Sequence, residues 1–276
     1  MDIQKQYKML MSEVFHTGNE KEDRTGTGTL SVFGRTITHD MENGFPILTT
    51  KKVFFDAALT ELLWILQGRT DLKYLHDNKV NYWDADYKRS GRTDMTLGPV
   101  YGKQWRDFSG VDQLKKLLLD IRSNPDSRRL MVSAWNPAEI KDMVLPPCHH
   151  SFQVYINNET VDLMWSQRSA DIFLGLPYDI VMYGLLLEFI AKGNNLKPGK
   201  LIGQLGDCHL YSNHLQQATA QLKRKFYNLP TLDLSYGLCV SNNTVLIPSH
   251  NSVSLKNYNS HPQIKAPLSV GQQLNN

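Results

Sequence analysis

One of the three cysteines, Cys148, lies in the segment whose residue types best suit covalent chemistry, LPPCHHSFQVYI at residues 145–156. Pro146 and Pro147 restrict the backbone just before the thiol, and the alternating apolar residues after it predict a strand. A thiol fixed at a strand edge can be aimed at a substrate, and its thiolate is a nucleophile. A cysteine taken alone is more often a small buried hydrophobic residue, so the neighbouring segments decide between the two interpretations.

The segment WSQRSADIFLGLPYDI at residues 165–180 places three charged side chains, Arg168, Asp171 and Asp179, among apolar neighbours. A charged group in such surroundings needs an ionic partner or a ligand. An arginine close to Cys148 would favour the thiolate over the thiol. Structural ion pairs are the alternative interpretation for Arg168 and Asp171, and this segment alone leaves both open.

The elements that position these residues follow from the periodicity of the apolar side chains. Helices are predicted at residues 3–14 (ended by Gly18), 54–68, 114–121, 178–191 and 209–223. A strand is predicted at 129–135, and a hairpin at 152–165 with its turn at 157–159. The polar, aromatic stretch at 69–110 is predicted to hold short helical pieces at most, which is typical of a functional segment. The mixture predicts one α/β domain over residues 1–270, with an extension at 271–276.

Composition narrows the class of protein. The chain has 276 residues, of which 41% are hydrophobic and 21% are charged, as in ordinary globular domains. A net charge of +3 is too small to argue for nucleic-acid binding. Three cysteines without a CxxC pair argue against a disulfide framework and a metal site, and they fit a reducing compartment. We find no signal peptide and no apolar run near the roughly 20 residues of a membrane span, so we expect a cytoplasmic protein.

Seven further segments, taken with residues 145–156, resemble the thymidylate synthase family. They are DRTGTGTLSVFG, ELLWILQG, LGPVYGKQW, DSRRLMVSAWNP, QRSADIFLGLP, GDCHLYSNH and HPQIKAPLSV. They occur in the family's order and spacing from about residue 3 to residue 270. The resemblance implies a single three-layer α/β domain whose large mixed β-sheet packs against its mate in a homodimer. It also implies transfer of a one-carbon unit from 5,10-methylenetetrahydrofolate to C5 of a pyrimidine deoxynucleoside monophosphate, without a metal.

The resemblance assigns a role to each matching residue. Catalytic roles fall on Cys148, Glu61, Asp179, Arg168, His149 and Tyr101. Nucleotide binding falls on Arg24, Arg128, Arg129, Gln167, Ser169, Asp171, Asp179, His209 and Tyr211. Folate binding falls on Lys51, Tyr82, Trp83, Leu145, Asp171, Leu174, Gly175 and Tyr178.

Within these sets, Cys148 would attack C6 of the pyrimidine, and Arg168 would both activate the thiolate and bind phosphate. Several guanidinium groups suit a dianionic phosphate through charge-assisted hydrogen bonds. Arg128 and Arg129 would reach the phosphate from the other subunit, which implies an obligate homodimer. Glu61 would organise water and relay protons to the base.

Asp179 departs from the family pattern, which has an asparagine that reads the uracil edge. An amide offers an acceptor to N3–H and a donor to O4, whereas an ionised carboxylate offers only acceptors. Cytosine reverses that edge, and a protonated carboxyl can accept from its N4 amine and donate to N3. We therefore expect dCMP to be preferred over dUMP. An aspartate at this position resembles phage enzymes that make modified cytosine nucleotides.

Several alternatives stay open. Trp83 and Leu145 resemble the branch that forms 5-methyl-dCMP, but a hydroxymethylase that forms 5-hydroxymethyl-dCMP and an ordinary thymidylate synthase acting on dUMP fit the same motifs. A dimeric RNA-binding regulator is the non-enzyme alternative, against which the retained Cys148, Arg168 and Glu61 argue. Asp86 also departs from the pattern, because it replaces a frequent tryptophan in the folate region.

Overall fold

A six-stranded mixed sheet organises the computed structural model, which describes residues 2–271. In spatial order its strands are β1 (Asn19–Lys21), β2 (Thr29–Asp40), β6 (Lys197–Tyr211), β5 (Thr160–Asp171), β4 (His149–Asn157) and β3 (Met131–Ser133). Neighbouring strands run antiparallel except β5 and β6, which run parallel. The chain therefore crosses over between β5 and β6, and a helix makes that crossover.

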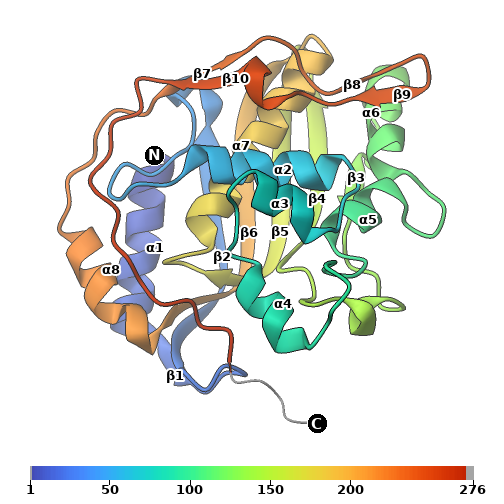
Figure 1. Ribbon diagram of the computed structural model, residues 1–276. Coiled ribbons are helices and arrows are strands. Elements are labelled where there is room, and N and C mark those ends of the chain that lie inside the picture. The colour runs from blue at the N-terminus through green and yellow to red at the C-terminus, as the bar shows by residue number, and fades with distance from the viewer. Residues whose placement is uncertain (1, 272–276) are drawn as a thin grey trace.

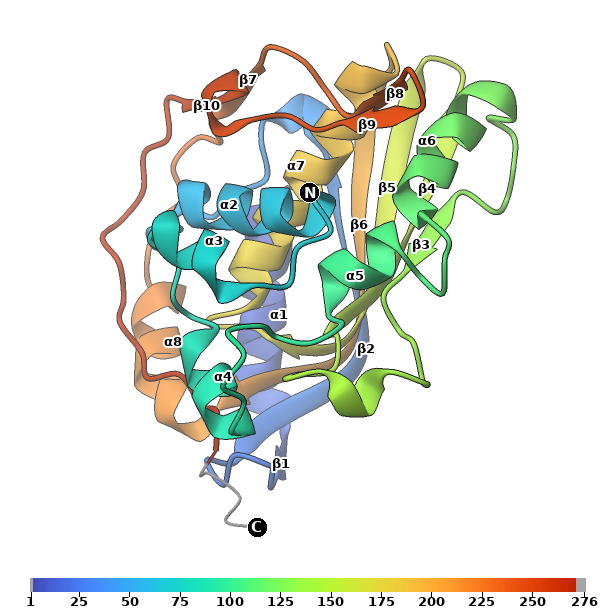
Figure 2. The ribbon, with the colours of Figure 1, turned by 45° about the vertical axis from the view of Figure 1, so that its right-hand side comes forward.

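Two layers of helices cover one face of the sheet. The inner layer consists of α7 (Leu176–Gly193), which packs on β5 and β6, and α1 (Ile3–Thr17), which packs on β2. The outer layer consists of α2 (Phe55–Leu66), which packs on α7, and α8 (Leu215–Leu222), which packs on α1. Figures 1 and 2 show α7 passing between α2 and the sheet. The predicted three-layer α/β architecture with a large mixed sheet is confirmed.

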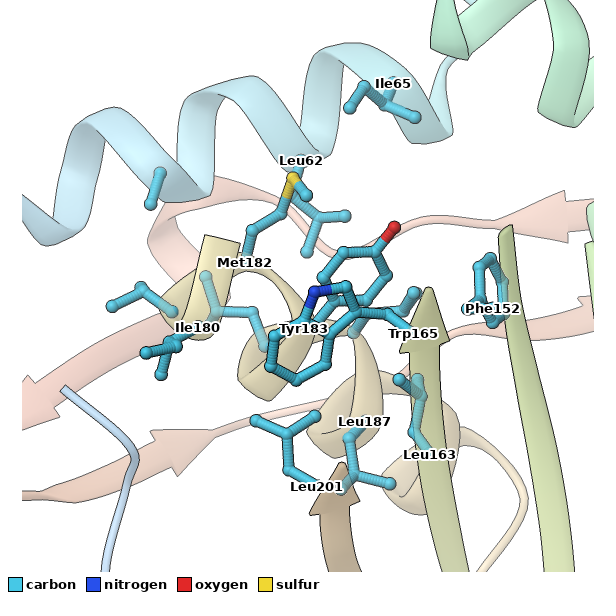
Figure 3. Close-up of a cluster of buried hydrophobic side chains, with 14 of the residues drawn as sticks. Leu62, Ile65, Phe152, Leu163, Trp165, Ile180, Met182, Tyr183, Leu187 and Leu201 are labelled. Atoms are coloured by element: carbon cyan, nitrogen blue, oxygen red, sulfur yellow. The ribbon is translucent and has the colours of Figure 1, made fainter. Parts of the chain in front are cut away.

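The core lies where α7 meets the sheet. Tyr183 of α7 stacks on Trp165 of β5, with ring centroids 5.2 Å apart and ring planes 7° apart. Phe152 of β4 meets Tyr183 edge-on at 6.2 Å, and Leu62 of α2 closes the cluster from the other side. Figure 3 shows these side chains between the helices and the strands. The sequence of α7 is apolar on nearly all sides, which predicts a helix surrounded by protein. The structure confirms this burial.

Helix α1 shows how local sequence sets the ends of an element. The Asp2 side chain caps its start by accepting from the backbone N–H of Lys5 at 2.9 Å, and Gly18 follows its last turn. Its buried stripe includes Ile3, Tyr7 and Val14. The predicted helices at 3–14, 54–68, 114–121 and 178–191 are confirmed as α1, α2, α6 (Gln113–Ser123) and α7. The predicted hairpin is confirmed as β4 and β5.

The predicted helix at residues 209–223 is wrong over its first part. His209 and Tyr211 belong to the end of β6, and the helical residues begin with the short 3-10 helix η3 (Ser212–His214) before α8. Strand β6 is hydrogen-bonded to β2 on one side and to β5 on the other along most of its length. This pairing keeps the chain in a strand conformation as far as Tyr211. The predicted strand at 129–135 is shorter than expected, because only β3 pairs with β4.

The remaining segments are short elements and loops. Residues 69–110 hold only α3 (Leu72–Asp77), α4 (Asp84–Ser90) and α5 (Tyr101–Arg106), as predicted. The other short elements are η1 (Met41–Asn43), η2 (Ile140–Asp142), β7 (Thr231–Leu234), β8 (Cys239–Ser241), β9 (Thr244–Leu246), η4 (His250–Ser252) and β10 (Val253–Lys256). In Figure 1 the chain after β10 runs down past α8 towards β1. Residues 272–276 of the predicted extension lie outside the described residues.

The C-terminal run ends against the loop between β1 and β2. Arg24 of that loop donates to the carbonyl of Val270 at 3.1 Å, and Thr27 donates to the Ser269 hydroxyl at 3.2 Å. The described chain therefore brings residues near both of its ends to one place. Within residues 2–271, none of the helices combines the length and apolar character that crossing a membrane would require.

Candidate active site

Arg168 of β5 clamps the segment that carries Cys148. Its backbone N–H donates to the Cys148 carbonyl at 2.8 Å, its Nε to the Pro147 carbonyl at 2.9 Å, and its Nη2 to the Pro146 carbonyl at 2.9 Å. The guanidinium also lies 5.7 Å from the ring centroid of Trp135. The guanidinium thus fixes two carbonyl groups and the Arg168 backbone a third, so Cys148 is held just before β4.

Tyr101 and His149 form the other wall around the cysteine. The Tyr101 hydroxyl accepts from the backbone N–H of Cys148 at 2.9 Å, and the Tyr101 ring stacks on the His149 imidazole with centroids 4.2 Å apart. The His149 Nδ1 lies 2.9 Å from the Tyr183 hydroxyl. Burial lowers the pKa of His149 to about 3. The imidazole is therefore neutral at physiological pH and acts as a hydrogen-bonding group rather than as a cation.

The thiol of Cys148 is protonated in the unliganded protein. Burial raises its pKa to about 11, although the charges of Arg168 and Arg24 act in the opposite direction. Asp179 and Asp86 add to the increase. The predicted influence of Arg168 is present, but burial outweighs it. The predicted role of Cys148 as a nucleophile would therefore require the thiol to lose its proton first.

Asp179, in the first turn of α7, is held by a chain of side-chain amide and indole donors. The Trp165 indole donates to Gln167 Oε1 at 3.1 Å, and Gln167 Nε2 donates to Asp179 Oδ2 at 2.7 Å and to the Ser169 carbonyl at 2.9 Å. Burial raises the pKa of Asp179 to about 7, and the nearby Glu61 and Asp171 carboxyls add to this while Gln167 opposes it. Near neutral pH the carboxyl is thus present in both charge states.

The carboxyl of Glu61, on α2, accepts two hydrogen bonds from side chains of the turn before α4. The Tyr82 hydroxyl donates to Oε2 at 2.6 Å, and the Trp83 indole donates to Oε1 at 2.7 Å. Burial raises the pKa of Glu61, while both donors stabilise its ionised form and oppose that rise. Glu61 is electrostatically coupled to Asp179, and Asp179 to the Cys148 thiol, so two half-buried carboxyls lie in one site with Cys148.

Four of the residues predicted to bind phosphate and ribose lie near the ends of β2, β5 and β6, namely Arg24, Ser169, His209 and Tyr211. Ser169 lies opposite Asp207 in the sheet, and the His209 and Tyr211 rings approach edge-on at 5.2 Å. Arg24 Nη2 lies 3.9 Å from a carboxylate oxygen of Asp86. Burial lowers the pKa of His209, but the Asp207 carboxylate outweighs burial and leaves the pKa above its usual value.

Residues predicted to bind folate lie in two groups. Asp171, at the end of β5, accepts from the backbone N–H groups of Phe173 and Leu174 at 3.0 and 3.1 Å. Lys51 is buried beneath this turn, where its ammonium donates to the Phe173 carbonyl and lies 3.9 Å from the Phe173 ring centroid. Burial lowers the pKa of Lys51 to about 8, and Asp171 opposes that decrease.

The second group surrounds Glu61 and the start of α7. Tyr178 lies in the first turn of α7, after Gly175, and its ring centroid is 6.2 Å from that of Tyr82. Leu145 and Leu174 are half-buried and pack against the core. These positions agree with a hydrophobic wall beside the carboxyls, while their role in binding folate stays a prediction.

A comparison with known proteins settles the family. The family model described as thymidylate synthase matches residues 5–270. The chain belongs to the thymidylate synthase family. It is 42% identical to the thymidylate synthase of Mesoplasma florum over 292 aligned positions, which cover 96% of this chain and 100% of that relative. Family membership identifies the reaction class as transfer of a one-carbon unit to a pyrimidine.

Two of the predicted residues lie apart from the rest of this thymidylate synthase-like site. Arg128 and Arg129 are exposed on the turn between α6 and β3. Among residues 2–271 no hydrogen bond joins their side chains to the Cys148 cluster; the Arg128 carbonyl instead accepts from Gln153 at 3.3 Å. Within one chain the Cys148 cluster therefore contains only Arg24 and Arg168 of the four arginines predicted to bind phosphate, and that role stays a prediction.

Sequence reasoning missed several contacts in this family site. Asp207 accepts from Ser31 at 2.8 Å and from Lys21 at 2.9 Å while it faces His209. Asp86 lies between Arg24 and Arg89. Asp207 in the segment GDCHLY and Asp86 could have indicated these contacts, because a charged residue inside a functional motif needs a partner.

A group of three or more His, Cys, Asp and Glu side chains arranged to hold a metal ion does not occur among residues 2–271. A groove of about 860 Å³ runs between α1 and β2, where Glu13 and Arg35 form an ion pair. None of its lining residues belongs to the Cys148 cluster, and we assign it no role.

Proposed function

We propose that the protein transfers the one-carbon unit of 5,10-methylenetetrahydrofolate to C5 of dCMP and releases 5-methyl-dCMP. The observation that carries this proposal is the half-buried carboxyl of Asp179 beside Gln167, whose pKa burial raises to about 7. At neutral pH a large fraction of this side chain is the neutral acid, which has both a donor and an acceptor.

The Gln167 amide fixes how that acid is arranged. Its Oε1 accepts from the donor-only Trp165 indole, so its Nε2 must face Asp179 Oδ2. Oδ2 is therefore an acceptor, and the acidic proton resides on Oδ1. An acid with Oδ1–H towards N3 and Oδ2 towards the N4 amine matches the cytosine edge. A buried unpaired polar group costs about 1–3 kcal/mol, so this match discriminates against uracil.

The reaction then uses the groups around the ring in sequence. The Cys148 sulfur adds to C6, and the electrons of the C5–C6 double bond move towards N3. Asp179 supplies the proton that N3 takes up, which leaves C5 nucleophilic for attack on the methylene carbon of the folate. Arg168, which already lowers the pKa of the thiol, stabilises the thiolate form of the nucleophile.

The remaining residues hold the nucleotide. Arg24, Arg168 and Ser169 would bind the phosphate, and His209 and Tyr211 the ribose hydroxyl. Arg128 and Arg129 would come from a second copy of the chain. Support for a homodimer comes from the outer sheet face, where Met131, Gln153, Met164 and Ile202 lie side by side across four strands. Tyr155 on this face is 64% exposed and Met131 is 50% exposed, as expected of a surface that pairs.

The test of base choice compares kcat/KM for dCMP and dUMP in the native protein and in Asp179→Asn. We expect dCMP to be preferred by at least about tenfold, and the substitution to reverse the preference, because a single lost complementary pair is worth about 1–3 kcal/mol. Turnover of dUMP at least as fast as that of dCMP by the native protein would contradict the proposal.

A second candidate is the conversion of dUMP to dTMP, which is favoured by 42% identity to a relative named thymidylate synthase. It requires the opposite placement of the neutral acid, with Oδ1–H towards O4 and Oδ2 towards N3–H. The same kinetic comparison separates the two candidates, since only one placement can serve each base.

The methyl product is proposed over the hydroxymethyl product because the Trp83 ring is buried and fixed by its bond to Glu61. Such a wall keeps water from the methylene intermediate until hydride transfer reduces it. Methyl formation produces dihydrofolate, whose absorbance rises during turnover. Turnover of dCMP with no absorbance change would favour the hydroxymethylase instead.

A further inference from the structure

We propose that Tyr82 is a positioning residue for Glu61: its hydroxyl fixes the carboxyl and follows its charge state by turning from donor to acceptor. The proposal rests on the proposed function, which gives Glu61 its part in relaying protons to the base. Tyr82 was predicted as a folate contact, so the inference adds a second role to the hydroxyl rather than to the ring.

The geometry assigns one donor to each oxygen of Glu61. Tyr82 and Trp83 are adjacent in the turn before α4, and the two side chains reach the same carboxyl at 2.6 and 2.7 Å. Trp83 is 8% exposed, and burial together with Glu61 holds the pKa of Tyr82 well above its usual value. The phenol therefore stays un-ionised and can only exchange hydrogen-bond roles.

The two donors are not equivalent. The Trp83 indole can donate but cannot accept, whereas the Tyr82 hydroxyl can do both. When Glu61 takes up a proton, Oε1 must continue to accept from the indole, so the proton resides on Oε2. Oε2 faces Tyr82, whose hydroxyl turns about its C–O bond and accepts. No proton leaves Tyr82 in either state, and the carboxyl keeps its orientation in both.

Other groups also act on this pair. Asp179 of α7 is coupled to Glu61, and Tyr101 of α5 is influenced by the Glu61 charge. Tyr178 and Asp179 of α7 also act on Tyr82, and the Tyr178 ring centroid lies 6.2 Å from that of Tyr82. Of these groups, only Tyr82 is in hydrogen-bond contact with Oε2. Loss of its hydroxyl therefore leaves the ionised form of Glu61 with one donor, and the coupling to Asp179 then favours the protonated form further.

The experiment is an infrared titration of Glu61 in the substrate-free protein, compared with the pH profile of kcat/KM for dCMP, which also reports the free protein. The carboxylic acid band of Glu61 is assigned by its loss in Glu61→Gln. In Tyr82→Phe we expect the titration of Glu61 to move up by about one pH unit, since the removed donor stabilises the ionised form. The acidic limb of kcat/KM should move by the same amount, while KM for methylenetetrahydrofolate changes less than about twofold.

Tyr74→Phe is the matched control, because within residues 2–271 the Tyr74 hydroxyl makes one hydrogen bond, to Gln67 at 3.4 Å, and none to Glu61. It should leave both the titration and the profile in place. An unchanged titration in Tyr82→Phe, with a raised KM for the folate, would overturn the proposal and leave Tyr82 as a folate contact only. Absence of turnover with both dCMP and dUMP would contradict the proposed function, and the substrate-free titration would still decide the role of Tyr82.

Discussion

Glu61 and Asp179 are two half-buried carboxyls in one site, and the sequence around them gives them different surroundings. Glu61 receives a donor on each oxygen, from Tyr82 and Trp83. Within residues 2–271, Asp179 receives a side-chain donor on Oδ2 alone, from Gln167. Burial raises the pKa of both groups, and it is opposed by two donors at Glu61 but by one at Asp179.

The comparison indicates that donor placement, rather than burial alone, selects the charge state of a carboxyl. A carboxyl with donors on both oxygens is kept closer to its ionised form and suits proton acceptance. A carboxyl with one oxygen left open keeps a proton there and suits donation to a base nitrogen. Pairs of acids whose surroundings separate their pKa values in this way divide the acid and base roles of a reaction.

The largest effect should come from removing the ionisable group that accepts protons. We expect Glu61→Gln to reduce kcat on dCMP by about 10²–10⁴-fold, the usual contribution of a positioned acid or base. Steady-state kinetics measures it. Glu188→Gln is the control, because Glu188 lies nine residues beyond Asp179 on α7 and is roughly 13 Å further along the helix. Equal losses in the two variants would argue against a specific role for Glu61.

The next effect concerns stability. The pKa of Asp179 is about 7 in the folded protein against an ordinary value of 3.8, so ionisation opposes folding. The contribution of Asp179 to stability is therefore lost between about pH 4 and pH 7 as pH rises, and above pH 7 this loss is complete. Asp179→Asn cannot ionise, so it should be more stable than the native protein by about 4 kcal/mol at pH 8 and similar to it below pH 4. Denaturant unfolding at the two pH values measures this difference, and an equal difference at both would contradict it.

The smallest expected effect, a shift of the pH profile, distinguishes the roles of Glu61 and Asp179 most clearly. In Gln167→Met the donor to Asp179 is lost, so the pKa of Asp179 should rise and the neutral acid should persist to higher pH. The alkaline limb of kcat/KM for dCMP should move up by up to about one pH unit. Tyr82→Phe removes the matching donor from Glu61 and should shift the acidic limb instead. If both variants move the same limb, the two carboxyls do not have separate roles.

Much of the fold was predictable because its helices bury regular apolar stripes. Helices α1 and α7 follow from the spacing of Ile3, Tyr7 and Val14 and from the apolar run after Tyr178. Strand β6 was not predicted, since Pro198, Gly203 and other glycines interrupt its pattern. Its strand conformation comes from pairing with β2 and β5, which are distant in sequence.

The site divides in the same way. The clustering of Cys148, Arg168 and Tyr101 was predicted from motifs that resemble the thymidylate synthase family, and the structure brings these residues together. The Tyr82–Glu61 bond could not be predicted, because it depends on how the turn before α4 meets α2. The protonation state of the Cys148 thiol could not be predicted from the sequence either, because the burial of the thiol determines it.

The central claim is that Asp179 reads the cytosine edge. Its most direct test is one reaction that contains equal concentrations of dCMP and dUMP with limiting methylenetetrahydrofolate, followed by mass analysis of the nucleotides. We predict that 5-methyl-dCMP is the main product of the native protein and dTMP the main product of Asp179→Asn. A native protein that forms mainly dTMP in this mixture would contradict the account.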